Sequence, residues 1–269
     1  MRQFISCVSP NSEGLVKISG KDYKYLAQVL RLTTGDMICL RIPDGSLLDA
    51  TVSKIDEKDK HLILQVCNPS FPLKKGENQS EYEIQTDFYL FQFMPKSSKM
   101  DFILRQAVEC GVKKLIPVIG EFCESYTAEK KFKNDRYERI IKEARQQSGS
   151  PIATEILQPL TLEDACNVWN EISEGDKEKS FACVLYERSL KTKNLYEALV
   201  NFKAIRHCAI FCGAEGGISP KEIDFFLEKG IIPIHFETNI LRCETAALYG
   251  TACLQSAITG KKLWKTTSV

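Results

Sequence analysis

Short apolar runs alternate with helix-forming segments through the last two thirds of this chain. The predicted elements are strands at 88–94 and 114–118, helices at 98–110 and 134–147, and further strands around Val184, Ile210 and Ile234. Helix start and stop signals separate them, such as Gly111 after the first helix. This alternation is typical of a mostly parallel sheet with helices on its faces, so an α/β fold is expected.

The first third of the chain is predicted to be β structure instead. Strands are expected at 37–41, 47–55 and 61–66, with Asp44-Gly45 as a hairpin turn, and a short helix at 22–30 precedes them. This pattern indicates a small β-barrel. Such a barrel often binds nucleic acid, but it can equally serve as a packing or dimerisation module.

A segment rich in turn formers and charged residues separates the two patterns. It begins with Asn68-Pro69-Ser70-Phe71-Pro72 and continues with Lys74-Lys75-Gly76. We therefore expect a β domain at 1–72, a linker at 73–82 and an α/β domain at 83–269.

Composition narrows the class of protein. The formal net charge is +1, so any contact with nucleic acid must come from a local cluster of Lys and Arg. No apolar stretch is long enough to span a bilayer, and the N-terminal residues lack the apolar core of a secretory signal. A cytoplasmic protein with no membrane partner is expected.

Eleven cysteines are scattered along the chain with no C-x-x-C pair. An odd, scattered set of thiols behaves as small buried hydrophobes in a reducing compartment. His207, Cys208 and Cys212 could be combined into a zinc site, but their spacing fits no common zinc template. The core interpretation is favoured, and no metal is expected.

Two short loops near the end of the chain each follow a predicted strand and precede a predicted helix. The first is Gly213-Ala214-Glu215-Gly216-Gly217, after the strand at 209–212. The second is Ile240-Leu241-Arg242-Cys243-Glu244-Thr245-Ala246, after the strand at 231–236. Loops at the carboxyl ends of parallel strands form a crevice for a small ligand, and we expect these two loops side by side.

The first loop has two interpretations from its residues alone. Its glycines permit positive φ and close backbone approach to a ligand, but tight turns contain glycines for the same reason. Ser219-Pro220-Lys221-Glu222 then starts a helix, with an N-cap serine and a capping-box glutamate. The loop is neither a G-x-G-x-x-G fingerprint nor a P-loop, so phosphate binding is not indicated.

The second loop holds charged residues ahead of a predicted helix at 246–257 that is rich in Ala, Gly and Ser. Arg242 and Glu244 could form a surface ion pair of little energetic value. Their place beside another strand-end loop favours a functional role. The small residues of the helix permit close packing, either in a crowded interior or against a second subunit.

Together the two loops resemble the C-terminal signature of a known enzyme family. G-A-E-G-G-I-S-P-K-E followed by I-L-R-C-E-T-A-A-L is similar to the signature of RsmE-type 16S rRNA uridine N3-methyltransferases. These are knotted enzymes of the SPOUT class. The resemblance extends to Lys99-Met100-Asp101, to 138–149, and to Val29-Leu30-Arg31-Leu32 with Gly35-Asp36 in the N-terminal domain. It covers nearly the whole chain in the right order.

The resemblance implies an α/β domain with a trefoil knot and a mostly parallel sheet, a PUA-like N-terminal β-barrel, and a homodimer. It also implies that S-adenosyl-L-methionine binds between the two loops and that the RNA partner is 16S rRNA or the 30S small ribosomal subunit. The cofactor-binding residues carried over are Cys212, Gly213, Glu215, Gly217, Ile218, Phe236, Ile240, Leu241, Arg242 and Thr245.

Arg242 and Glu244 are the candidate catalytic residues. Methyl transfer needs N3 of the uracil as an in-line nucleophile, so positioning should dominate, and the N3 proton must be lost. We expect Arg242 to stabilise negative charge developing on the uracil edge. Glu244 or a water would take the proton; otherwise Glu244 only orients Arg242 or caps the following helix.

Clustered basic residues form the candidate RNA surface. On the helix predicted at 134–147 they recur every third residue, although a solvated helix face is the commoner explanation of such a run. The candidate residues are Arg136, Arg139, Lys142 and Arg145 on this helix, and Arg2, Lys24 and Arg31 in the N-terminal domain.

Several positions depart from the family pattern, among them Tyr25, Gln106 and Ala214, where a histidine, a lysine and a proline are usual. Glu237 stands where a glycine is usual, and Asn239 and Ser150 stand where arginines are usual. Lost arginines remove charge-assisted hydrogen bonds, but the positions of these arginines lie outside the centre of both loops. Three functions remain open: methylation of 16S rRNA in small-subunit maturation, methylation of another RNA on the same fold, and a catalytically weak RNA-binding ribosome-assembly factor.

Overall fold

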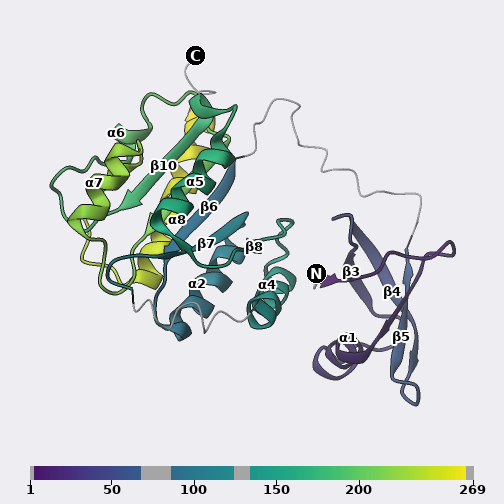
Figure 1. The fold of residues 1–269 in the computed structure, drawn as a ribbon. Helices are drawn as coiled ribbons and strands as arrows, with labels where there is room; N and C mark the ends of the chain where they lie inside the picture. Colours follow the sequence, from purple (N-terminus) through teal and green to yellow (C-terminus); the bar gives the residue numbers. More distant parts are fainter. Residues whose placement is uncertain (1–2, 68–85, 124–133, 265–269) are drawn as a thin grey trace. The chain divides into compact units, whose positions relative to one another are not determined.

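The computed structural model describes residues 3–67, 86–123 and 134–264 (Figure 1). The chain divides into two compact units, one of Met1–Glu83 with Gln146–Pro151 and the other of Ile84–Arg145 with Ile152–Val269. The predicted linker at 73–82 lies outside the described residues, so the predicted domain boundaries stay a prediction.

The first unit is built on a five-stranded sheet with the order β1-β3-β4-β5-β2. Its strands are β1 (Gln3–Ile5), β2 (Leu15–Ser19), β3 (Met37–Arg41), β4 (Leu47–Asp56) and β5 (His61–Val66). β1 pairs with β3 in parallel, and the other pairs are antiparallel. At the predicted hairpin turn, Gly45 has a φ of +88° and Asp44 Oδ1 accepts a hydrogen bond from Ser46 N at 2.8 Å. The predicted β structure is confirmed.

One short helical segment packs on this sheet. α1 (Gly20–Lys24) continues into a π-helical turn, η1 (Tyr25–Val29), so the predicted helix begins earlier than expected and widens at Tyr25. Leu26 anchors the turn because it is fully buried in the core of the unit with Phe4 and Leu40. π-turns are uncommon and frequently mark functional sites.

The second unit contains a seven-stranded sheet in which every described strand pair is parallel. Its strands are β6 (Asp87–Phe93), β7 (Lys114–Ile119), β8 (Glu155–Ile156), β9 (Leu160–Thr161), β10 (Ser180–Leu185), β11 (His207–Cys212) and β12 (Ile232–Ile234). Their order is β12-β10-β11-β6-β7-β8, and β9 also pairs with β7. The predicted parallel sheet is confirmed.

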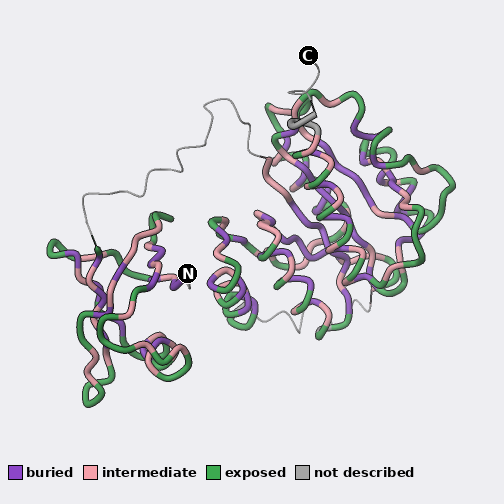
Figure 2. Tube along the Cα trace, turned by 180° about the vertical axis from the view of Figure 1, so that it is seen from behind, coloured by how far each residue is buried: buried purple, intermediate pink, exposed green. Residues whose placement is uncertain are grey.

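Helices cover both faces of this sheet. They are α2 (Ser97–Glu109), α4 (Asn134–Ser148), α5 (Leu162–Ser173), α6 (Leu195–Leu199), α7 (Pro220–Glu228) and α8 (Cys243–Trp264), with a short 3₁₀ turn, η2 (Lys177–Lys179). Because successive side chains of a strand point to opposite faces, Ile210 packs in the core beneath α2, α4, α6 and α8. Phe211 packs in the core beneath α5 and α7. The central strands are therefore buried on both sides, as Figure 2 shows.

α8 lies close against the sheet because small residues face it. A Cβ on Gly250 would stand 2.6 Å from Ile210 Cδ1 and 2.7 Å from Leu185 Cδ1. Of the two roles considered for the small residues of this helix, Gly250 therefore fits close packing in a crowded interior.

None of the described helices combines the length and the apolarity that crossing a membrane requires. The trefoil knot and the homodimer stay predictions.

Candidate functional site

The two signature loops leave the carboxyl edge of the parallel sheet, but their strands are not neighbours. β10 lies between β11 and β12, which corrects the prediction that the two strand ends lie side by side. The chain leaving β10 therefore emerges between the loops, and Tyr186 N donates to Ile234 O at 3.0 Å. Glu187 follows, with Oε2 only 3.6 Å from where a Cβ on Gly217 would stand. Glu187 is a candidate site residue that the sequence analysis missed.

The glycines of the first loop are needed for different reasons. Gly217 has a φ of +74°, in the left-handed region that glycine adopts without strain. Gly213 and Gly216 do not share this conformation, so the predicted positive φ holds for Gly217 alone among the three. They are needed for space: a Cβ on Gly216 would stand 2.7 Å from Phe122 Cβ, and one on Gly213 would stand 3.0 Å from the carbonyl carbon of Gly217.

The helix that follows the first loop begins as predicted. Ser219 Oγ accepts a hydrogen bond from Glu222 N at 3.2 Å, and Glu222 Oε2 accepts one from Ser219 N at 2.8 Å. Proline occupies the start of α7, so the capping box and the proline are both confirmed. Glu222 Oε1 also accepts from Glu121 N at 2.8 Å, which ties the loop after β7 to the first loop.

A buried glutamine holds the base of the first loop. Gln92, near the end of β6, is fully buried, and its Nε2 donates to Cys212 O at 3.2 Å and to Gly213 O at 3.1 Å. Its Oε1 is buried without a hydrogen-bond partner. Gln92 was not predicted as a site residue, although an amide inside an otherwise apolar strand is a signal of a specific role.

A lysine from a third segment links the two signature loops. Lys99, in the first turn of α2, places Nζ 3.3 Å from Glu215 Oε1 of the first loop and 3.2 Å from Glu244 Oε2 of the second. The Cys243 thiol donates to the same Glu244 oxygen at 3.2 Å. Glu244 therefore pairs with Lys99 rather than with Arg242, so the surface ion pair considered from the sequence is not formed. Lys99 lies in a segment that carries the family resemblance, but it had not been assigned to the site.

These contacts shift the pKa values of the groups involved. Burial raises the pKa of Glu215 and of Glu244, but hydrogen bonds from backbone N–H groups and from Lys99 outweigh it, so both pKa values lie below the ordinary value. Desolvation lowers the pKa of Lys99, yet its bonds to both carboxylates leave it raised. Burial, with a contribution from Glu244, raises the pKa of Cys243 to about 11. The cluster thus holds one cation, two carboxylates and a neutral thiol at neutral pH.

The remaining predicted site residues differ widely in exposure. Arg242 is exposed, and no carboxylate pairs with it in the described parts of the chain. Ile240 is 85% exposed, whereas the Cys212 side chain is fully buried, so Cys212 can reach a ligand only through its backbone. Phe236 is half-buried and packs edge-on against Tyr249 at 5.1 Å between ring centroids. Of the others, Ile218 is buried, Gly213, Gly217 and Leu241 are half-buried, and Glu215 and Thr245 are exposed.

The basic stripe on α4 is partly neutralised. Arg136 pairs with Asp101, and Arg139 lies 3.8 Å from Glu143, one turn further along the helix. Lys142 and Arg145 are half-buried. In the first unit, Lys24 and Arg31 are exposed, and Arg31 has a φ of +54°. Arg2 lies outside the described residues.

The structure places the zinc candidates apart. Cys208 and Cys212 are buried in the core beneath α2 and α8, and burial raises the pKa of both thiols. His207 lies on the opposite side of β11, where its Nδ1 is 3.3 Å from the Tyr89 hydroxyl. In the described parts of the chain, the side chains that could converge on a metal ion are Asp56, Asp59 and His61 at the β4–β5 turn. Asp56 is already used there, because its Oδ1 accepts from Asp59 N at 2.9 Å.

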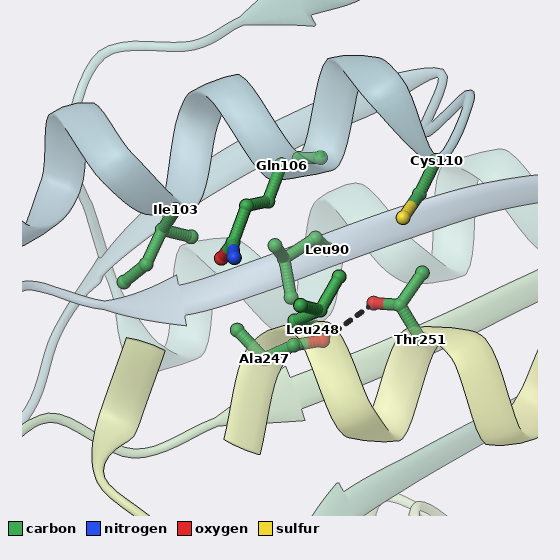
Figure 3. Close-up of a pocket in the computed structure, with 8 residues that line it drawn as sticks. Leu90, Ile103, Gln106, Cys110, Ala247, Leu248 and Thr251 are labelled. Carbon is green, nitrogen blue, oxygen red and sulfur yellow. Dashed lines mark hydrogen bonds between the residues drawn. The ribbon is translucent and has the colours of Figure 1, made fainter. Parts of the chain in front are cut away.

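A small apolar cavity lies between α2, β6 and α8 (Figure 3). Its volume of about 10 Å³ has room for at most one water molecule. Gln106 points into it and has a buried Oε1 without a hydrogen-bond partner, whereas the Thr251 hydroxyl donates to Ala247 O at 2.7 Å. This cavity is too small for a cofactor, so the candidate ligand site remains the crevice at the carboxyl edge.

Comparison with known proteins identifies the class. Residues 82–255 match the RNA methyltransferase domain, and residues 18–65 match the RNA methyltransferase PUA domain. The chain therefore belongs to the RNA methyltransferase family. The predicted α/β fold with an N-terminal PUA-like domain is confirmed.

Particular relatives agree with the resemblance drawn from the loops. The chain is 33% identical over 169 residues to ribosomal RNA small subunit methyltransferase E of Aquifex aeolicus, a match covering 60% of this chain and 65% of that protein. It is 27% identical over 263 residues to ribosomal RNA small subunit methyltransferase E 2 of Borreliella burgdorferi, covering 96% and 98%. Its fold is similar to the crystal structure of ribosomal RNA small subunit methyltransferase E from Neisseria gonorrhoeae bound to S-adenosyl methionine, with a TM-score of 0.75, 21% identity, and 96% and 98% of the two chains covered.

Proposed function

We propose that this protein transfers a methyl group from S-adenosyl-L-methionine to N3 of a uridine in 16S ribosomal RNA, during maturation of the small ribosomal subunit. The observation that carries the proposal is the pair of signature loops joined through Lys99 at the carboxyl edge of the sheet. The chain that holds them belongs to the RNA methyltransferase family, and its relatives are named ribosomal RNA small subunit methyltransferases.

Features of the crevice fit this cofactor. Gly213 and Gly217 bring backbone groups to its surface without side chains, and backbone N–H and C=O groups can hydrogen-bond an adenine edge. The orphaned Oε1 of Gln92, beside Gly213, is an acceptor that still lacks a donor. Ile240, 85% exposed, offers apolar surface to a purine ring. The crystal structure from N. gonorrhoeae, similar in fold, is described as bound to S-adenosyl methionine.

When bound, S-adenosyl-L-methionine supplies an electrophilic methyl group. Arg242 has an exposed guanidinium that no described carboxylate neutralises, so it can stabilise negative charge developing on the uracil edge as N3 attacks. The proton leaves N3 for Glu244 or for water. The lowered pKa of Glu244 keeps it ionised at neutral pH but makes it a weak base, so positioning contributes more to the rate than proton transfer does.

RNA would bind through local positive charge, since the net charge of the chain is only +1. Lys24 and Arg31 are exposed in the PUA-like unit. On α4, Arg136 and Arg139 already pair with acidic residues, so their contribution to RNA binding requires those pairs to open. We also propose that the protein is a cytoplasmic homodimer whose partner is 16S rRNA or the 30S subunit, as the resemblance implies.

The test is to identify modified nucleotides in small-subunit rRNA from cells that lack this protein. N3-methyluridine should be absent and should return with the wild-type protein. In vitro, Arg242→Ala should lower the rate of methyl transfer roughly 10- to 100-fold, the effect of losing a charge-assisted hydrogen bond of about 1.5–3 kcal/mol. Lys203→Ala is the matched control, because Lys203 is exposed and precedes β11 at the other edge of the sheet.

Each outcome assigns a function. Near-normal turnover by Arg242→Ala would refute the role of that residue. Unchanged N3-methyluridine in the deletion cells would refute the target, and calorimetry with S-adenosyl-L-methionine would then decide between the two alternatives. Binding would favour a methyltransferase with another RNA target, and absence of binding would favour a catalytically weak RNA-binding assembly factor.

A further inference from the structure

The cluster around Lys99 joins parts of the chain that no strand pair joins. Glu215 follows β11 and Glu244 begins α8 after β12, and β10 separates those two strands. Lys99 forms an ion-pair bridge between the two loops, at 3.3 Å from Glu215 Oε1 and 3.2 Å from Glu244 Oε2. The packing of α8 on the sheet sets the general position of the second loop, and Lys99, which belongs to neither loop, adds a polar link between the two walls of the crevice.

The contacts also fix the orientation of each carboxylate. Glu215 Oε1 accepts from Lys96 N at 3.2 Å as well as from Lys99, so this oxygen is held at the N-terminus of α2, where a negative charge is favoured. Glu244 Oε2 is bound by Lys99 and by the Cys243 thiol together. Because both contacts fall on one oxygen, the Glu244 carboxylate is oriented without Arg242.

Lys99 is well placed to act in this way because it is partly shielded. Its side chain is 29% exposed, and those of Glu215 and Glu244 are 32% and 17% exposed. Most surface ion pairs contribute little, but a lysine shared by two carboxylates on separate loops is a small network with restricted geometry. Its main effect is expected on the position of the loops rather than on global stability.

We propose that Lys99 is a positioning residue for the methyl-transfer site, which holds the first loop at Glu215 and the second loop at Glu244 in a fixed relative position. The proposal rests on the proposed function for its catalytic consequence, but its structural part does not. If Lys99 acts in this way, its loss loosens both loops in the ligand-free protein and misplaces the reacting groups when ligands are bound.

The first experiment needs no ligand. Amide hydrogen exchange is compared in the wild-type protein, Lys99→Met and Lys114→Met. Lys114 is the matched control because it also pairs with a glutamate, Glu155, at 3.1 Å, on strand β7 away from the crevice. Exchange at 213–217 and at 240–246 should become several-fold faster in Lys99→Met and stay unchanged in the control. Unchanged exchange in both loops would overturn the proposal, whatever the function of the protein.

The second experiment measures S-adenosyl-L-methionine binding and methyl transfer. Lys99→Met should lower kcat about 10- to 100-fold, the usual effect of a misplaced reacting group. The acidic limb of its pH–rate profile should move to higher pH, because Glu244 loses a neighbouring cation that lowers its pKa. Lys99→Arg should recover most of the activity. A kcat within twofold of wild type and an unmoved pH profile would overturn the proposal.

A further variant covers the case in which Lys99→Met does not fold. Glu215→Gln keeps the size of the side chain and removes one of the two charges that Lys99 joins, so it should show the same faster exchange in both loops. Normal exchange in this variant would overturn the proposal. Failure of the proposed function has a different signature, since the wild-type protein itself would then not methylate 16S rRNA, whatever its binding of S-adenosyl-L-methionine.

Discussion

Glu222 stabilises three segments around the first signature loop, and its replacement by alanine should be costly. Its carboxylate accepts from Ser219 N and from Glu121 N, both at 2.8 Å. Ser219 is 2% exposed, so its N–H would be left without water, whereas Glu121 is exposed and its N–H can be hydrated. A buried unsatisfied donor costs about 1–3 kcal/mol, and the lost bond at Glu121 adds about 1 kcal/mol. We expect Glu222→Ala to lower the free energy of unfolding by about 2–4 kcal/mol.

The assay is urea unfolding followed by tryptophan fluorescence, with Glu222→Gln and Glu228→Ala as companions. Glu222→Gln keeps an acceptor oxygen and the shape of the side chain, so it should lose about half as much. Glu228 lies exposed at the end of the same helix, and its replacement should stay within about 0.5 kcal/mol of wild type. If Glu222→Ala unfolds with the same free energy as Glu228→Ala, the carboxylate does not hold these segments and the reasoning is refuted.

Two further predictions concern titration and thiol access. Desolvation, together with Lys113 and Arg206, lowers the pKa of His207 by more than Asp87 and Asp176 raise it. The unfolded state therefore binds more protons, and the stability present above about pH 6.5 should fall as the pH drops below that value. Urea unfolding at pH 7.5 and pH 5.5 should show a smaller loss for His207→Gln than for wild type, and equal losses would contradict this. A thiol reagent added to the native protein should modify the exposed Cys7 and Cys67. Cys183 should react only after unfolding, because it is buried and burial raises its pKa. Equal labelling rates for the three thiols in the native protein would contradict the burial of Cys183.

Local sequence signals were sufficient for much of this fold. The strands predicted at 37–41 and 61–66 match β3 and β5, and the capping box at Ser219 and Glu222 forms as expected. Each of these signals acts over a few neighbouring residues. In these segments few backbone conformations satisfy both the hydrophobic pattern and the hydrogen bonds. A single sequence is therefore enough to predict the two strands and the helix start.

The parts that sequence reasoning missed depend on which distant segments meet. The insertion of β10 between β11 and β12 brings Glu187 next to Gly217, and no local pattern encodes the order of strands in a parallel sheet. Lys99 was visible as part of a family-like segment. Its role emerges only when α2 is placed against both loops, because its two carboxylate partners are far away in the chain.

Side-chain exposure distinguishes the residues just before the second loop from Glu244 within it. Residues 237–240 are all exposed, and the Thr238 hydroxyl donates to a neighbouring carbonyl, that of Asn239. A change at Glu237 or Asn239 therefore costs little stability, and its main effect is expected on what this segment binds. Glu244, by contrast, is held by Lys99 and Cys243, so a change there would disturb the fold of the crevice as well. We therefore expect the departures from the family pattern at Glu237 and Asn239 to change what this segment binds, while Lys99 and Cys243 keep Glu244 in place.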